Sequence, residues 1–235
     1  MIERLLPAPV RSAETRGAGP GAEGLLPAEE ALLVRAVPKR RREFGSGREC
    51  ARRALVGLGL PRDPLLRTRD GDPRWPPGVV GSITHCPGYC AAAVARTADL
   101  VSVGIDAEVN EPLSPGVIEL VSRPEERRWA DAGPRGGSGV CWDRLLFSAK
   151  EAVFKAFFPL SRQELSFQDA LIEAAPEGGR FEARVMVPAP RVGGRTVDRL
   201  AGRWLVEDGL LLTAVTVPAA RPGRAEGARP GTGPS

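Results

Sequence analysis

Apolar residues recur at helical spacing in several stretches of the chain, and these stretches predict its helices. The clearest one contains Cys50, Ala54, Leu55 and Leu58, and its helix should end at Gly59 and Pro61. Further helices are expected within residues 27–37, 117–129 and 147–158.

β-branched and other apolar runs predict strands between and after these helices. They lie at residues 79–85 and 100–109, with a further apolar run at 90–95, and a C-terminal sheet is expected from residues 165–174, 181–187 and 204–217. Stretches rich in glycine, proline or charge predict loops at residues 11–24, 61–78 and 132–139. Residues 218–235 have no periodicity and predict a disordered tail.

The helix expected after Phe147 carries an unusual concentration of lysine. Ser148 is placed to cap it, Glu151 has the spacing of a capping box, and Pro159 should end it. Only three of the 33 basic residues are lysines, and Lys150 and Lys155 both fall in this helix. Lysine offers a compact point charge where arginine offers a rigid fork. Glu151 and Lys155 share one helix face, which indicates either a solvated ion pair or a site that needs that charge.

Composition sets the broad class of the protein. The 235 residues suffice for one large or two small domains, and a net charge of +4 with a pI of about 9.2 suits an anionic ligand or partner. No stretch of about 18 apolar residues predicts a membrane span, and no secretory signal is readable, so a cytoplasmic protein with reduced cysteines is expected. His85, Cys86 and Cys90 match no common zinc spacing, and thiols are favoured over a metal site there.

Asp106 and Glu108 follow a β-branched run at positions i and i+2 of one predicted strand. Strand alternation places both carboxylates on one face, roughly 6.6 Å apart. Two neighbouring carboxylates repel each other, and a divalent cation such as Mg²⁺ removes that cost. A strand end with two solvated acids is the alternative explanation.

Three further groups are candidates for phosphate or purine binding. The basic residues from Lys39 to Arg42 form either a solvated charged segment or a phosphate-binding segment. Arg74 and Trp75 could hold a purine or simply pack within a loop. His85 is the only histidine and stands at a strand end with Ser82 and Thr84, where it could donate to a phosphate oxygen or serve structure alone.

Three stretches, in this order, resemble the 4'-phosphopantetheinyl transferase superfamily: residues 81–85 (GSITH), 104–108 (GIDAE) and 147–155 (FSAKEAVFK). Residues 40–48 and 73–76 resemble the enterobactin-type branch, which is close to the surfactin-type monomeric enzymes. The resemblance covers about residues 35–160. It implies an α+β fold of two similar α/β subdomains that form a pseudo-dimer with the active site at their interface. On this basis we expect subdomains at residues 1–108 and 109–217, followed by the tail at 218–235.

The resemblance also implies a reaction and a role for each matching residue. The 4'-phosphopantetheine group of coenzyme A would pass to a serine of an apo acyl or peptidyl carrier protein, leaving adenosine 3',5'-bisphosphate. Mg²⁺, or alternatively Mn²⁺, would bind Asp106, Glu108 and Glu151, and Glu151 is also the candidate base. The expected contacts to coenzyme A are Lys155 and Lys150 at the pyrophosphate, Ser82 and His85 at phosphates, Arg41 and Arg48 at the 3'-phosphate, and Arg74 near the adenine.

Three other functions stay open from the sequence. A nucleic-acid-binding protein would explain the pI and residues 39–42, although a single tyrosine and the lack of interleaved aromatic residues count against it. A Mg²⁺-dependent phosphohydrolase would use the same acids. A relative that binds coenzyme A without transfer is disfavoured by the complete acid and lysine set. We expect a monomer that acts on carrier proteins of polyketide, nonribosomal peptide or fatty-acid synthases and binds neither nucleic acid nor membrane.

Overall fold

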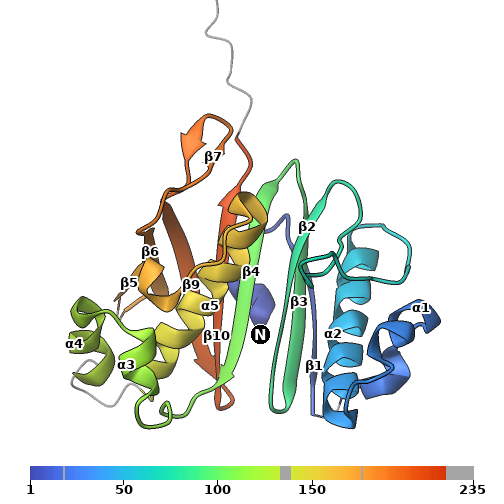
Figure 1. Cartoon of the computed structure of the whole chain (residues 1–235), viewed down its shortest axis with the longest axis horizontal. Helices are drawn as coiled ribbons and strands as arrows, with labels where there is room; N and C mark the ends of the chain where they lie inside the picture. The colour runs from blue at the N-terminus through green and yellow to red at the C-terminus, as the bar shows by residue number, and fades with distance from the viewer. Residues whose placement is uncertain (18, 133–138, 176, 221–235) are drawn as a thin grey trace, which may run out of the picture.

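Two antiparallel sheets lie side by side in the computed structural model, which describes residues 1–17, 19–132, 139–175 and 177–220 (Figure 1). The N-terminal sheet has the order β1-β3-β2, with β1 at Arg11–Arg16, β2 at Val79–Cys86 and β3 at Tyr89–Arg96. The C-terminal sheet has the order β4-β10-β9-β6-β5, made of Leu100–Val109, Leu210–Pro218, Arg199–Glu207, Arg180–Val185 and Ala170–Ala175. A small pair, β7 (Arg191–Val192) and β8 (Arg195–Thr196), extends from one end.

Each sheet is covered by one long helix of 20 residues. Helix α2 (Pro38–Gly57) packs on β1 and β3, and helix α5 (Trp142–Ser161) packs on β4 and β10 (Figure 1). Shorter helices lie at the outer sides of the two halves: α1 (Pro27–Glu30), α3 (Val117–Val121) and α4 (Pro124–Ala132). There are 3-10 turns at Gly21–Gly24, Ala31–Leu33 and Phe167–Asp169, and a further one at Ile2–Leu5 contacts strands of both sheets. No helix among the described residues is long and apolar enough to cross a membrane.

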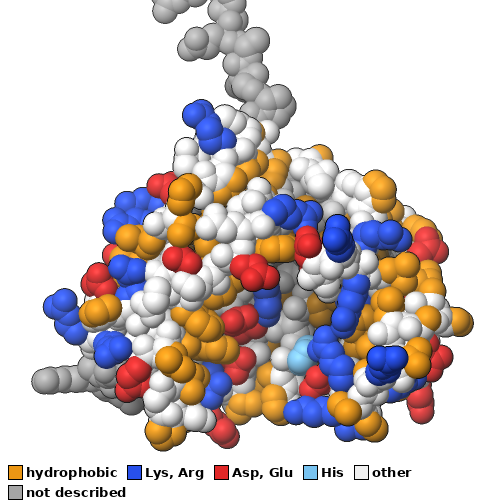
Figure 2. Space-filling view, in the orientation of Figure 1, with side chains coloured by type: hydrophobic (Ala, Val, Ile, Leu, Met, Phe, Trp, Pro, Cys, Tyr) orange, Lys and Arg blue, Asp and Glu red, His pale blue; other side chains and the backbone are white. Residues whose placement is uncertain are grey.

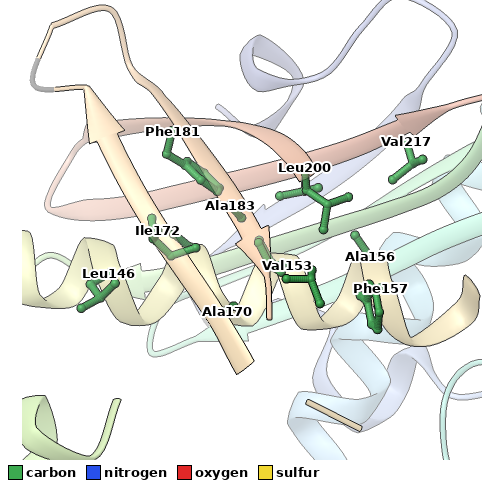
Figure 3. Close-up of a cluster of buried hydrophobic side chains, with 14 of the residues drawn as sticks. Leu146, Val153, Ala156, Phe157, Ala170, Ile172, Phe181, Ala183, Leu200 and Val217 are labelled. Atoms are coloured by element: carbon green, nitrogen blue, oxygen red, sulfur yellow. The ribbon is translucent and has the colours of Figure 1, made fainter. Parts of the chain in front are cut away.

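The C-terminal core forms where α5 lies on its sheet. Val153 and Phe157 of α5 are fully buried against Ile172 of β5 and Phe181 of β6 (Figure 3). Burial of four such side chains is worth several kcal/mol by area, since each fully buried one contributes about 1.5–3 kcal/mol. The face of α5 that carries Val153 and Phe157 is therefore fixed in the C-terminal core, and another face of the helix points toward the N-terminal half.

Strands β2 and β4 are the facing edges of the two sheets. The Ser82 hydroxyl accepts the backbone N–H of Ile105 at 3.1 Å, and the Thr84 hydroxyl accepts that of Ala107 at 3.0 Å. Both bonds advance by two residues on each strand, so β2 and β4 run in the same direction here. Within the described ranges, no main-chain ladder joins these strands, and side-chain hydroxyls close the gap instead.

The α+β fold class is confirmed, while several local expectations are wrong. The loop expected at residues 11–24 contains strand β1, which pairs with β3 from Arg11↔Val94 to Arg16↔Tyr89. The helix expected at 117–129 is two helices, because Pro124 opens a new first turn. The strand expected at 204–217 is the β9–β10 hairpin, turned by Asp208 and Gly209, both with positive φ.

The helix expected around residues 147–158 is longer at both ends. It begins at Trp142, and Pro159 lies inside it, in its last turn, before Arg162 ends the helix in the left-handed region at φ 56°. Ser148 is consequently an interior residue and not the cap.

The predicted domain division and the similarity of the two halves stay predictions. Strand β4, which precedes the expected boundary at residue 108, hydrogen-bonds β10 in the C-terminal sheet. Residues 133–138 of the expected glycine-rich loop and residues 221–235 of the expected tail lie outside the described residues.

Candidate active site

Gly104 lets helix α5 touch strand β4. A Cβ atom at Gly104 would lie 2.0 Å from the carbonyl oxygen of Ala152 and 2.6 Å from the nitrogen of Ala156, so no side chain fits. The Ser102 hydroxyl donates to the Ala156 carbonyl at 2.6 Å on the same strand. Because backbone meets backbone here, the side chain of Asp106, which follows Gly104 on β4, reaches Ser148 and Lys155 of α5 directly.

Asp106 is the most connected side chain of this region. It is 4% exposed, and its Oδ1 accepts from Lys155 Nζ at 2.6 Å and from the Thr84 hydroxyl at 3.2 Å. Its Oδ2 accepts from the Ser148 hydroxyl at 2.8 Å. Three side chains from two elements, α5 and β2, thus hold one carboxylate, as expected for a buried charge, which is stable only when paired and hydrogen-bonded. The sequence pattern indicated Lys155 and Asp106 but did not reveal the roles of Thr84 and Ser148.

Glu108 and Glu151 are half-buried carboxylates near Asp106. Burial raises the pKa of both, and the charge of Asp106 raises it further. Arg144 opposes this at Glu108, to which it donates at 3.0 Å, while the charge of Lys155 opposes it at Glu151. Glu151 makes no hydrogen bond or ion pair with any described residue, so it is available to a ligand.

A metal ion suits the chemistry of this group. All three acids offer hard oxygen donors, and burial, together with the charge of Asp106, raises the pKa values of Glu108 and Glu151. A divalent cation would favour their ionised forms. Lys155 and Arg144 partly supply that positive charge here. In the described part of the chain, no three His, Cys, Asp or Glu side chains are gathered tightly enough to form a finished metal site. The donor set fits Mg²⁺: Asp106 is paired with Lys155, Glu108 is paired with Arg144, and Glu151 has no ion-pair partner among the described residues.

His85 lies at the end of β2, facing α2. It lines a pocket of about 600 Å³ with Glu108 of β4 and with residues of α2 that include Arg42 and Glu43. Figure 2 shows the one histidine in a hollow between the halves, with Lys and Arg side chains along one side. Burial lowers the pKa of His85, Glu43 and Asp106 raise it, and Arg40 and Lys155 lower it further. The imidazole therefore lies within electrostatic reach of both the Asp106–Lys155 pair and the basic residues of α2.

A cluster of arginines lies beside this hollow, and we call Arg40, Arg48 and Arg67 the arginine cluster. The guanidinium of Arg48 lies 4.2 Å from the Phe44 ring centre, and that of Arg67 lies 4.8 Å from it. Arg48 is 4% exposed, its Nε has no hydrogen-bond partner in the described part of the chain, and burial together with Arg67 and Arg40 lowers its pKa to about 10. A buried cation without an acceptor is costly, and an anionic ligand would remove that cost.

Arg41 is turned away from the arginine cluster, contrary to the expected contact. It pairs with Glu30 at 2.8 Å and donates to the Leu33 carbonyl at 3.0 Å, both at the outer side of α2. Adjacent helix residues point about 100° apart, so Arg40 lies on another side of α2, where its charge acts on Arg48 and His85. Arg40 and Arg67 are the members of the cluster that sequence reasoning missed, because a run of basic residues does not reveal which of them face inward.

Lys150 is not brought to the site. Its ammonium is fully buried and uses all three hydrogens, on Glu126 at 2.7 Å and on the carbonyls of Val121 at 2.8 Å and Phe167 at 2.7 Å. Glu126 in turn accepts the backbone N–H groups of Arg123 and Ile172. The expected contact of Lys150 with the pyrophosphate therefore needs correction: this lysine ties α5 to α3, α4 and the 3-10 turn that precedes β5.

Arg74 and Ser82 line a second pocket, of about 650 Å³, that also includes Lys155. Trp75 covers Gly81 of β2 so closely that a Cβ there would meet the indole at 2.6 Å. Arg74 is exposed and lies in this pocket, consistent with its expected place near a ligand. Ser82 borders the same pocket, although its hydroxyl oxygen already accepts the Ile105 N–H.

Comparison with known proteins adds independent evidence. Residues 28–95 match a family model described as the 4'-phosphopantetheinyl transferase N-terminal domain, and residues 102–190 match one described as the 4'-phosphopantetheinyl transferase superfamily. The chain is 54% identical to the 4'-phosphopantetheinyl transferase Svp of Streptomyces mobaraensis over 209 residues, which cover 89% of this chain and 85% of that protein. It is 45% identical to the 4'-phosphopantetheinyl transferase PptT of Mycobacterium tuberculosis over 196 residues, 82% of this chain and 86% of that protein. It is 44% identical to the 4'-phosphopantetheinyl transferase Npt of Nocardia iowensis over 223 residues, 92% of this chain and 99% of that protein.

Proposed function

Because the chain belongs to the 4'-phosphopantetheinyl transferase superfamily, we propose that Asp106, Glu151 and Lys155 form the centre of its transfer reaction. The protein is a 4'-phosphopantetheinyl transferase, which moves the 4'-phosphopantetheine group of coenzyme A to a carrier-protein serine. The observation that carries the assignment of the centre is the 2.6 Å contact between Lys155 and Asp106, with the unpaired Glu151 one helical turn away. This arrangement favours transfer over a nucleic-acid-binding role.

Glu151 is the proposed base for the serine of the carrier protein. In the reaction the serine oxygen forms a bond to the phosphorus that carries pantetheine, the bond from that phosphorus to the adenosine 3',5'-bisphosphate oxygen breaks, and the serine proton must leave. The raised pKa of Glu151 makes it a stronger base than a surface carboxylate. Lys155, a compact cation, neutralises charge that grows on the leaving phosphate. His85 donates an N–H to a phosphate oxygen at the same site.

Asp106, Glu108 and Glu151 would hold Mg²⁺, with Mn²⁺ as the alternative ion. Bound Mg²⁺ would supply positive charge to the pyrophosphate oxygens and keep them in place. The protein contributes the rest through its own side chains. Asp106 fixes Lys155, and Arg144 fixes Glu108 until a ligand takes its place.

We assign the arginine cluster to the 3'-phosphate of coenzyme A, with Arg40 in place of Arg41. Phosphate prefers the forked donors of arginine, and Arg48 has a buried nitrogen without a partner in the described residues. Arg74, beside Trp75 in the second pocket, is proposed to contact the adenine end. Ser82 is proposed to border the phosphates while its oxygen holds β4.

The proposed partners are apo acyl or peptidyl carrier proteins of polyketide, nonribosomal peptide or fatty-acid synthases, met by a monomeric enzyme. Carrier proteins are commonly acidic around their serine, and the net charge of +4 suits such a partner. A Mg²⁺-dependent phosphohydrolase would release phosphate from nucleotides with no carrier present, which separates it from a transferase by experiment.

The test is to incubate the purified chain with coenzyme A, Mg²⁺ and a panel of apo carrier proteins, and to weigh the carriers by intact mass spectrometry. We expect a phosphopantetheine-sized gain that EDTA and Glu108→Ala abolish, while the exposed control Glu182→Ala keeps it. Coenzyme A binding is measured in parallel by calorimetry. Absence of both binding and mass gain in the folded protein would overturn the proposal, as would a full gain with Glu108→Ala.

A further inference from the structure

Two buried hydroxyls stand behind Asp106, in a place that neither coenzyme A nor the carrier protein can reach. Ser148 of α5 and Thr213 of β10 are both fully buried. The Ser148 hydroxyl donates to Asp106 Oδ2 at 2.8 Å and lies 2.9 Å from the Thr213 hydroxyl. Thr213 is also the residue of β10 that pairs directly with Asp106 on β4.

Counting hydrogens fixes the direction of this chain. Each hydroxyl has one hydrogen, and an ionised carboxylate only accepts, so the Ser148 hydrogen belongs to Asp106. The Thr213 hydrogen then has two acceptors within reach, the Ser148 hydroxyl oxygen at 2.9 Å and the Ser148 carbonyl at 3.0 Å. Both acceptors belong to Ser148. Through the hydroxyl oxygen, Thr213 holds the Ser148 rotamer that faces Asp106, and through the carbonyl it holds the Ser148 backbone that carries this side chain.

We propose that Ser148 and Thr213 are positioning residues of the transfer reaction, which set the rotation of the Asp106 carboxylate. This inference rests on the proposed function of Asp106. With Oδ2 fixed from behind by Ser148, Oδ1 is turned toward Lys155 and Thr84, where the reaction takes place. Without Ser148, the carboxylate is free to rotate about its terminal bond, since such torsions have broad minima.

The size of the effect follows from comparable sites. Partners that orient a metal-binding group through a hydrogen bond change affinity or activity by about 10–100-fold when removed. A mainly structural hydroxyl would instead alter stability and leave turnover per folded molecule unchanged. The two roles are therefore separable by measurement.

The test compares Ser148→Ala, Thr213→Val and Thr213→Ser with two controls. Thr213→Val keeps the shape and removes the hydroxyl, so it serves where Ser148→Ala fails to fold, and Thr213→Ser restores the hydroxyl. The matched controls are Ser161→Ala and Thr216→Val. The Ser161 hydroxyl donates to the Phe157 carbonyl in the last turn of α5, and Thr216 is partly buried on β10. The readouts are kcat, the KM for coenzyme A, the melting temperature, and calorimetric binding of Mn²⁺ alone.

We expect kcat to fall about 10–100-fold in Ser148→Ala and about tenfold in Thr213→Val, with the KM for coenzyme A within about twofold and Mn²⁺ affinity reduced in parallel. Thr213→Ser should recover most of the loss, and the controls should match the wild type. A lower melting temperature with unchanged kcat and Mn²⁺ affinity in both variants would overturn the proposal. Failure of the proposed function itself is distinct, because the wild type would then show no transfer.

Discussion

Lys155 and Asp106 stand 49 positions apart in the chain and meet at 2.6 Å, one on the exposed side of helix α5 and the other on the edge strand β4. The Lys155 side chain is 31% exposed and that of Asp106 is nearly buried, so the pair has one member inside the protein and one that borders the second pocket. An ammonium held in this way is oriented by a buried carboxylate and is still accessible to a phosphate.

Lys155→Met should remove charge stabilisation from the reaction more than it removes binding. We expect kcat to fall by at least about 100-fold, as when a single stabilising donor is removed from other active sites, with a smaller change in the Kd for coenzyme A. Lys155→Arg should recover binding better than turnover, because the guanidinium is larger and cannot occupy the position of the ammonium. Both kcat and the Kd for coenzyme A are measured on the same preparations, by kinetics and by calorimetry. An unchanged kcat in Lys155→Met would contradict the proposed role of Lys155 in charge stabilisation.

Gly104→Ala should separate α5 from β4. The new Cβ would overlap the Ala152 carbonyl, so the helix must shift, at a cost of about 1–3 kcal/mol by analogy with overpacked cores. Turnover should fall as well, because the distance from Lys155 to Asp106 depends on that contact. The control is Gly57→Ala on α2, where the nearest atom is 3.4 Å away on the flexible Arg11 side chain and stability should hold or improve. Urea unfolding measures both, and equal stability of Gly104→Ala with the wild type would refute the argument.

Lys150→Met should unfold the protein more readily without a specific loss of catalysis. Glu126 would be left as a buried charge without its cation, which costs about 3–5 kcal/mol. Adding Glu126→Gln should restore part of the stability, because the uncharged amide still accepts one backbone N–H. Turnover per folded molecule should stay near the wild-type value. A stable Lys150→Met protein with weakened coenzyme A binding would instead support the original expectation of a phosphate contact.

Arg40→Ala and Arg41→Ala form a matched pair of neighbouring charge removals. One charge-assisted hydrogen bond contributes about 1.5–3 kcal/mol, so Arg40→Ala should raise the Kd for coenzyme A by about tenfold or more. Arg41→Ala should keep the Kd within about twofold, since Arg41 is paired with Glu30 outside the hollow. Titration with coenzyme A and with dephospho-coenzyme A, which lacks the 3'-phosphate, provides the check. Equal weakening by both variants would remove the distinction between them.

The pKa of His85 can be measured directly by NMR, because this is the only histidine and gives one set of imidazole signals. Burial and the cations Arg40 and Lys155 favour its neutral form, so the pKa should lie below the usual 6.5 and the ring should be mostly neutral at pH 7. Anionic coenzyme A favours the protonated form, so binding should raise this pKa and take up protons. Lys155→Met should also raise it in the free protein, while Arg41→Ala should not. A pKa indifferent to coenzyme A would exclude the contact.

The three motif stretches could be assigned from the sequence because each combines residue types that are chemically uncommon together. Asp106, Glu108, Glu151 and Lys155 fall in one region of the structure, and the periodicity of residues 50–58 correctly predicted α2. Lys150 was the misleading member. A five-residue step on a helix rotates a side chain by about 140°, so Lys150 and Lys155 cannot share a face.

Other features had no local signature. Ser148 followed by Glu151 gives the same pattern at a helix start and in a helix interior, and only the packing of α5 on β4 and β10 shows which applies. Strand β1 is polar because it is an edge strand, and its pairing with β3 overrides its composition. The position of Arg40 within electrostatic reach of Arg48 and His85 depends on the rotation of α2 about its axis, which a run of four basic residues leaves undetermined.

The hydroxyls of Ser82 and Thr84 hydrogen-bond strand β2 to strand β4 and so connect the two halves of the protein. Any parting of β2 from β4 would expose two sheet edges at once and exchange the hydroxyl acceptors of the Ile105 and Ala107 amides for water, at a net cost of about 0.5–1.5 kcal/mol each. The Thr84 hydroxyl also donates to Asp106, so one oxygen atom takes part both in the contact between β2 and β4 and in the proposed reaction centre. The two halves are thus tied together at β2 and β4, beside the hollow that His85 and Glu108 line.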